Sequence, residues 1–84
     1  MMNLFKSKEE KELDAIIQRI EINMQNNYKD NAQAAFAELM AAFENMINKG
    51  EISEKTIVRY KSLIDEYTVK LQGYSHKDQK PYWT

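Results

Sequence analysis

The residue types best suited to nucleophilic catalysis stand close together near the C-terminus of this sequence. Ser75, His76 and Asp78 supply the hydroxyl, imidazole and carboxylate that a catalytic triad combines. In a triad, a rigid scaffold holds the base between the nucleophile and the orienting acid, and neighbouring residues of an irregular segment lack such a scaffold. The sequence also has no glycine-rich phosphate loop and no nucleophile elbow. We therefore predict that the protein is not an enzyme.

Acidic side chains gather near the N-terminus, at Glu9, Glu10, Glu12 and Asp14. Helical carboxylate sites for metal ions pair such acids with histidines in a Glu-x-x-His spacing. The only histidine, His76, is far from this cluster, and the chain has no cysteine. Acids in the first turns of a helix are stabilised by the positive end of the helix dipole. This pattern predicts a helix start, with no metal site and no cofactor.

The segment 50–60 resembles the turn and recognition helix of helix-turn-helix DNA-binding proteins, because a glycine turn leads to a serine cap and then to Thr, Val and Arg. The resemblance, within residues 46–62, implies DNA contacts from these side chains: Lys55, Thr56, Arg59 and Lys61. The turn is one residue longer than the usual spacing, and the preceding helix is longer than the positioning helix of the motif. The helix predicted over 54–72 carries four basic against three acidic residues. A DNA-binding face needs several uncompensated positive charges, so nucleic acid is not the partner we expect.

Aromatic side chains are the main candidates for partner binding. Tyr60, Tyr67 and Tyr74 recur every seven residues, which places three phenol rings along one edge of a helix. The rings can line the rim of the chain's own core with their hydroxyls in water, or they can form an interface, where tyrosine is enriched. Tyr82 and Trp83 can fold back over a seam between helices, dock into another protein as an extended peptide, or fray. We take these five residues as the candidate interaction surface.

Helices must position these residues, and the first is predicted over 8–26. Ser7 and Glu10 have the spacing of a capping box, which satisfies free amide groups at a helix start. Apolar residues then recur at three- and four-residue steps and form one stripe. This stripe comprises Leu13, Ile16, Ile17, Ile20 and Met24. Ile22 falls on the opposite face.

A second helix is predicted over 31–49, beginning with a capping box at Asp30-Asn31-Ala32-Gln33 and ending before a left-handed Gly50. Its apolar stripe is about 140° wide, which suits a helix that touches two neighbours. The stripe comprises Ala32, Ala35, Phe36, Leu39, Met40, Phe43, Met46 and Ile47. The stripes of the first and second helices are rotated by roughly 110° from each other, so one straight helix cannot present both to one core. This rotation predicts a turn at 26–31, and a continuous helix in a domain-swapped form is the alternative.

A third helix is predicted over 54–72. Ser53 caps it, Ile52 and Ile57 hold the positions of a hydrophobic staple, and Gly73 closes it. The apolar stripe comprises Ile57, Tyr60, Leu63, Ile64, Tyr67 and Leu71. Val58 and Val69 lie off this stripe.

The composition agrees with a small helical domain. The chain has 84 residues, of which 43% are hydrophobic, and a formal net charge of −1. These values exclude a strongly basic nucleic-acid binder, and the lack of cysteine excludes a disulfide scaffold. Short connections make consecutive helices antiparallel. We predict one domain over 1–84 with an all-α fold, an antiparallel up-down-up three-helix bundle with an irregular aromatic C-terminal tail over 74–84.

The small size also bears on function. A chain this short buries only about 60% of its unfolded surface, so a second copy or another protein would add stability. No segment has the roughly 20 apolar residues of a membrane span, and the first ten residues turn charged where a signal peptide would be apolar. We expect a cytoplasmic protein-interaction or structural module that binds a protein partner or forms a homodimer, with no membrane partner and no small-molecule substrate. The alternative is a small regulatory DNA-binding protein.

Overall fold

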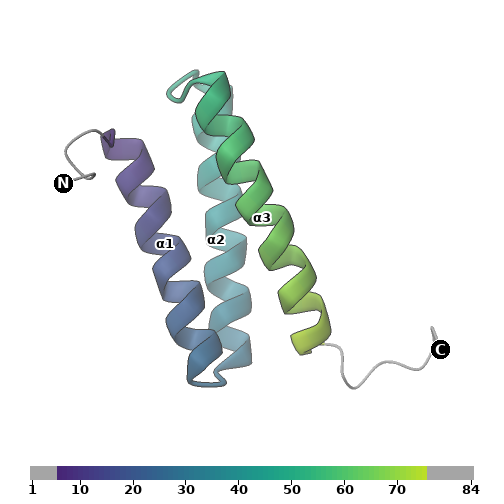
Figure 1. The fold of residues 1–84 in the computed structure, drawn as a ribbon. Coiled ribbons are helices and arrows are strands. Elements are labelled where there is room, and N and C mark those ends of the chain that lie inside the picture. Colours follow the sequence, from purple (N-terminus) through teal and green to yellow (C-terminus); the bar gives the residue numbers. More distant parts are fainter. Residues whose placement is uncertain (1–5, 76–84) are drawn as a thin grey trace.

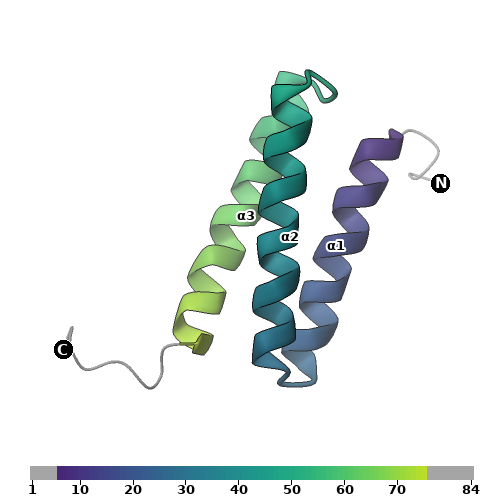
Figure 2. The ribbon, with the colours of Figure 1, turned by 180° about the vertical axis from the view of Figure 1, so that it is seen from behind.

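The helices of the protein pack side by side with alternating direction (Figure 1). The computed structural model describes residues 6–75, with side chains as far as Gln72. Over this range the chain forms α1 (Lys8–Gln25), α2 (Lys29–Asn48) and α3 (Glu54–Ser75), and no strand. α2 runs antiparallel to both neighbours, and α1 and α3 point the same way along it (Figures 1 and 2). The predicted all-α, up-down-up bundle of three helices is confirmed over these residues.

One apolar core lies between α2 and its two neighbours. Its buried side chains are Leu13, Ile16 and Ile20 of α1, Ala32, Ala35, Leu39, Phe43 and Met46 of α2, and Tyr60, Ile64, Tyr67 and Leu71 of α3. They follow the predicted three- and four-residue steps, and Ile22, Val58 and Val69 are exposed as expected. The backbones of α1 and α2 are close along more of their length than those of α2 and α3. Within residues 6–75, the backbones of α1 and α3 do not pack against each other.

The predicted starts of α1 and α3 are confirmed. The Ser7 hydroxyl accepts a hydrogen bond from the amide of Glu10 at 3.1 Å, and the Glu10 carboxylate accepts one from the amide of Ser7 at 3.0 Å. At α3, the Ser53 hydroxyl accepts from the amide of Thr56 at 3.2 Å. Ile52 and Ile57 both pack against the core, which completes the staple around this cap.

The connection between α1 and α2 differs in detail from the prediction. The chain turns through Asn27, whose φ of 64° is left-handed, and α2 begins at Lys29. The capping position is Tyr28, and no side chain caps the helix there. The capping box predicted at Asp30 does not form, because Asp30 already lies within the first turn of α2. The turn itself is present, so α1 and α2 are separate helices.

Two further predictions about the helices are wrong. α3 continues through Gly73 to Ser75, since one glycine inside a helix costs only about 1 kcal/mol. Tyr74 therefore belongs to α3 and not to the tail, whereas Tyr82 and Trp83 lie outside the described residues. Met40 and Ile47 were expected in the core but are 46% and 37% exposed. The apolar stripe of α2 is wider than the surface that α1 and α3 cover.

Gly50 ends α2 as predicted. Its φ is +66°, and a Cβ atom added there would meet nothing within 4 Å. Backbone conformation therefore favours glycine at this position, whereas crowding plays no part.

Candidate functional site

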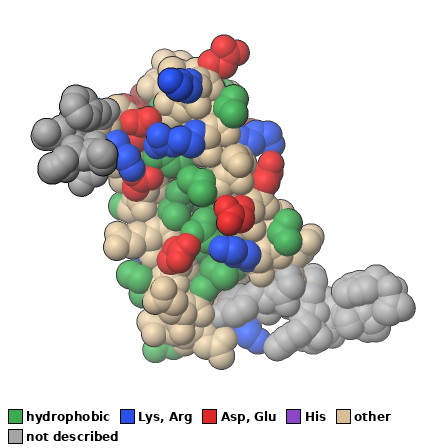
Figure 3. Space-filling view, viewed as in Figure 1, with side chains coloured by type: hydrophobic (Ala, Val, Ile, Leu, Met, Phe, Trp, Pro, Cys, Tyr) green, Lys and Arg blue, Asp and Glu red, His purple; other side chains and the backbone are tan. Residues whose placement is uncertain are grey.

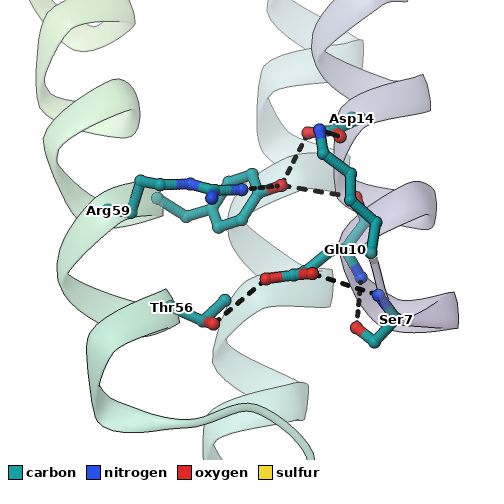
Figure 4. Close-up of polar contacts among 7 residues, drawn as sticks. Ser7, Glu10, Asp14, Thr56 and Arg59 are labelled. Carbon is teal, nitrogen blue, oxygen red and sulfur yellow. Dashed lines mark hydrogen bonds and ion pairs between the residues drawn. The ribbon is translucent and has the colours of Figure 1, made fainter. Parts of the chain in front are cut away.

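A polar network joins the beginning of α1 to the beginning of α3 (Figure 4). The ring of Tyr60, on α3, is fully buried, and its hydroxyl donates to Asp14 Oδ1 on α1 at 2.7 Å. Arg59 Nη2 donates to the same hydroxyl oxygen at 3.0 Å, and the guanidinium also lies 4.8 Å from the centre of the Tyr60 ring. Lys6 pairs with Asp14 from the other side. The phenol, its carboxylate acceptor and two cations therefore form one cluster.

Glu10 extends this network to both helix caps. One oxygen of its carboxylate accepts from the Ser7 amide, and the other accepts from the Thr56 hydroxyl at 3.1 Å. The Thr56 hydroxyl accepts in turn from the Ser53 hydroxyl at 3.0 Å. A continuous chain of hydrogen bonds thus connects the first turn of α3 to the first turn of α1.

A second link between the same helices lies two turns farther along, where the Tyr67 hydroxyl donates to Glu21. Figure 3 shows this face of the molecule, on which hydrophobic side chains run between α1 and α3 and charged side chains flank them. Ile17 and Leu63, three residues beyond Asp14 and Tyr60, are partly buried against the core. Apolar residues of α1 and α3 therefore lie between the two polar links.

The structure places two of the three tyrosines of this spacing, Tyr60 and Tyr67, inside the protein. The rings of Tyr60 and Tyr67 belong to the core, which agrees with the first of the two interpretations of their spacing. Their hydroxyls donate to carboxylates of α1, whereas the spacing of the tyrosines predicted hydroxyls in water. The signal was present, since Asp14 and Glu21 are also seven residues apart. The side chains of Tyr74, Tyr82 and Trp83 lie outside the described part of the chain.

The phenols of this network do not act as bases at neutral pH. Burial and the hydrogen bond to Asp14 raise the pKa of Tyr60 to about 12, although Arg59 acts in the opposite direction. Burial and the hydrogen bond to Glu21 likewise raise the pKa of Tyr67. A general base works best with a pKa near the operating pH. Both hydroxyls therefore stay protonated and serve as donors that hold α3 to α1.

The residues implied as DNA contacts are mostly engaged within the chain. Thr56 and Arg59 belong to the polar network, and Lys61 forms an ion pair with Asp65 at 3.7 Å. Lys55 is exposed. α2 and α3 lie antiparallel, whereas the helices of a helix-turn-helix cross at about 90–120° (Figure 1). The structure therefore gives the DNA-binding alternative no support.

Between Lys6 and Ser75, no group of three or more His, Asp or Glu side chains is arranged to hold a metal ion. No helix in that range is long and apolar enough to cross a membrane. His76 and Asp78, of the candidate triad, lie outside the described residues.

An apolar groove of about 350 Å³ lies along the outer side of α2 and α3, and we call it the α2/α3 groove. It is lined by Met40, Phe43, Glu44, Ile47, Lys61, Ile64, Asp65 and Thr68. Phe43 and Ile64 are nearly buried, whereas Met40 and Ile47 are exposed. Figure 2 shows α2 in front with α3 beside it. The groove thus has an apolar interior with charged side chains around it.

Two more exposed apolar side chains lie on the side of α3 that carries the charged rim of the groove. Val58 and Val69 are 66% and 68% exposed. Val58 stands seven residues before Asp65, and Val69 stands four residues after it, so all three share one side of the helix. Of the six large hydrophobic side chains exposed among the described residues, four therefore lie in or beside the α2/α3 groove.

This clustering was not foreseen from the sequence, because Met40 and Ile47 fit the period of the core.

Comparison of the chain with protein-family models, with curated proteins and with solved structures gives no match.

Proposed function

We propose that this protein is a non-enzymatic helical interaction module that binds a protein partner through the α2/α3 groove. The observation that carries the proposal is the exposure of Met40 and Ile47 directly beside nearly buried Phe43 and Ile64. Contiguous apolar surface rimmed by polar residues is typical of protein interaction sites. Full burial of a Met or Ile side chain contributes about 1.5–3 kcal/mol, so a partner gains from covering both.

The shape of the groove favours a protein over a small molecule. Pockets for small ligands usually enclose about 300–1,000 Å³ and hold a few buried polar groups that orient the ligand. The α2/α3 groove is at the low end of that range, and its charged residues, Glu44, Lys61 and Asp65, are all exposed. A groove between two antiparallel helices matches the apolar face of a third helix.

The polar network between α1 and α3 supports a structural role for its residues. The Tyr60 hydroxyl, Asp14 and Glu10 each make hydrogen bonds within the protein. The raised pKa of Tyr60 also keeps this hydroxyl protonated at neutral pH. These groups stabilise the bundle and so leave the α2/α3 groove as the binding surface.

Photo-crosslinking tests the proposal. Benzoylphenylalanine at Met40 should give an adduct in the cell, whereas the same group at Ala41, an exposed position about 100° further around α2 and outside the groove lining, should not. The partner in the adduct, once purified, should bind the wild-type chain and bind Met40→Glu at least about tenfold more weakly. Equal adducts from both positions, or binding that Met40→Glu leaves unchanged, would contradict the proposal.

A further inference from the structure

The chemistry around the α2/α3 groove indicates what occupies it. We propose that a second copy of this chain binds there, with α3 of one copy antiparallel to α3 of the other about a twofold axis. This inference rests on the proposed function, because it names the partner of the same surface. In such an interface the same patch of both copies meets, so the patch must be complementary to itself.

Lys61 and Asp65 provide self-complementary charges. They are four residues apart on the side of α3 that lines the groove, and their ion pair of 3.7 Å is largely exposed. In an antiparallel pair that places Lys61 opposite Asp65 of the second copy, symmetry places Asp65 opposite Lys61 of the second copy. Each copy thus contributes both a cation and an anion to the contact. The net charge of −1 causes little repulsion between copies.

The same register also aligns apolar surface. It places Val58, which is exposed, opposite Thr68 of the second copy, because Val58 precedes Lys61 by as many residues as Thr68 follows Asp65. Thr68 lines the groove, and its hydroxyl donates to the carbonyl of Ile64 at 2.8 Å. Since that hydroxyl already has a partner, Thr68 can be covered by Val58 without losing a hydrogen bond. One arrangement therefore satisfies both charge and packing.

The projected area of this face reaches the lower end of the range for stable protein interfaces. α2 and α3 have 20 and 22 residues. At a rise of 1.5 Å per residue and a diameter of about 10 Å, the two helices present roughly 600 Å² in projection. The contoured surface is larger than this projection, and a standard interface buries about 800 Å² on each partner. Met40 and Ile47 would lie within the covered area.

Two charge variants test the pairing. Lys61→Glu leaves acidic side chains at both positions 61 and 65, and Asp65→Lys leaves basic side chains at both. We expect wild-type protein in sedimentation experiments to form a dimer at concentrations up to ~1 mM, and each variant alone to bind itself at least about tenfold more weakly. An equimolar mixture of the variants should form a heterodimer with an affinity close to that of the wild type. Both variants break the internal ion pair, so only contacts between copies explain recovery on mixing.

A matched control uses the ion pair on the other side of α3. Lys70 and Glu66 are also four residues apart, with a separation of 3.8 Å. Lys70→Glu and Glu66→Lys change the charge by the same amounts away from the groove, and both should dimerise as the wild type does. Equal weakening by these variants would overturn the proposal, because it would show an effect of net charge alone.

Other outcomes separate this inference from the proposed function. A wild-type chain that stays monomeric, or a mixture that fails to recover, overturns self-pairing. If the crosslinker at Met40 then joins a different protein, the groove remains the docking site and only its occupant is wrong. A monomer without any adduct contradicts both proposals. A dimer that forms only after deletion of residues 76–84 would identify the chain's own C-terminal segment as the occupant.

Discussion

The Tyr60 hydroxyl donates to Asp14 across 46 positions of the chain, at a distance of 2.7 Å. The same separation of 46 joins Thr56 to Glu10 and Tyr67 to Glu21. Each step along α1 is therefore matched by an equal step along α3, as in two parallel helices held in register. The backbones of α1 and α3 do not pack directly against each other, so these side-chain links join two helices that are both aligned on α2.

Removal of the Tyr60 hydroxyl should destabilise the fold. Tyr60→Phe keeps the buried ring but takes the donor from Asp14, so we expect the free energy of unfolding in urea to fall by about 1–2 kcal/mol. Tyr28→Phe removes an exposed hydroxyl and should change the free energy of unfolding by less than about 0.5 kcal/mol. Equal effects of the two substitutions would mean that the buried hydrogen bond contributes nothing.

Stability should fall at alkaline pH. The pKa of Tyr60 is raised to about 12, whereas an unfolded tyrosine titrates near 10. The stabilisation is complete below pH 10 and is lost as the pH rises towards 12, because the unfolded chain releases its proton first. Unfolding in urea at several pH values, with phenolate absorbance as a second signal, measures this loss. Tyr60→Phe should lose less stability over that interval, and a slope identical to that of the wild type would contradict the assignment.

Substitution of the two glycines by alanine should change the stability of the protein in opposite directions. Gly50→Ala places a Cβ at a left-handed φ of +66°, which costs roughly 1–2 kcal/mol although the surrounding space is open. Gly73→Ala lies within α3 and should stabilise the protein by up to about 1 kcal/mol, because alanine is the better helix former. Thermal unfolding of both variants provides the comparison. Stabilisation by Gly50→Ala would be inconsistent with the left-handed turn.

Adjacent apolar residues of α2 should differ strongly in their effect on stability. Leu39 is buried in the core, so Leu39→Ala should cost about 2–5 kcal/mol. Met40 lies in the α2/α3 groove, so Met40→Ala should cost less than about 1 kcal/mol in the monomer. Denaturation at a protein concentration too low for a dimer to form measures the effect of each substitution on the monomer alone. A large loss for Met40→Ala would place this side chain in the core and remove the basis of the groove.

The serine caps and the buried stripes could be predicted from the sequence because they depend on neighbouring residues, whereas the start of α2 and the end of α3 could not. Ser7 and Ser53 cap their helices through residues three positions away, and the buried stripes follow helical period. The bond between Tyr60 and Asp14 depends instead on how α1 and α3 are aligned across α2. A common spacing of seven residues indicates that alignment only once the helices are known to be parallel.

The groove could not be predicted for a different reason. Periodicity shows that Met40 and Ile47 lie on the apolar side of α2, but it does not show how far the neighbouring helices extend over that side. Coverage depends on the position of α3, which follows from packing of Phe43 and Ile64. Surface and core residues of one wide stripe therefore look alike until the helices are assembled.

Glu10 has one carboxylate oxygen on the amide of Ser7 and the other on the hydroxyl of Thr56. Loss of the first turn of α1 would therefore remove a hydrogen bond from the first turn of α3, although the two residues of this bond are 46 positions apart. In native-state hydrogen exchange, amides at the beginnings of both helices should open as one cooperative unit. Local unfolding at this end of the bundle thus involves two helices at once.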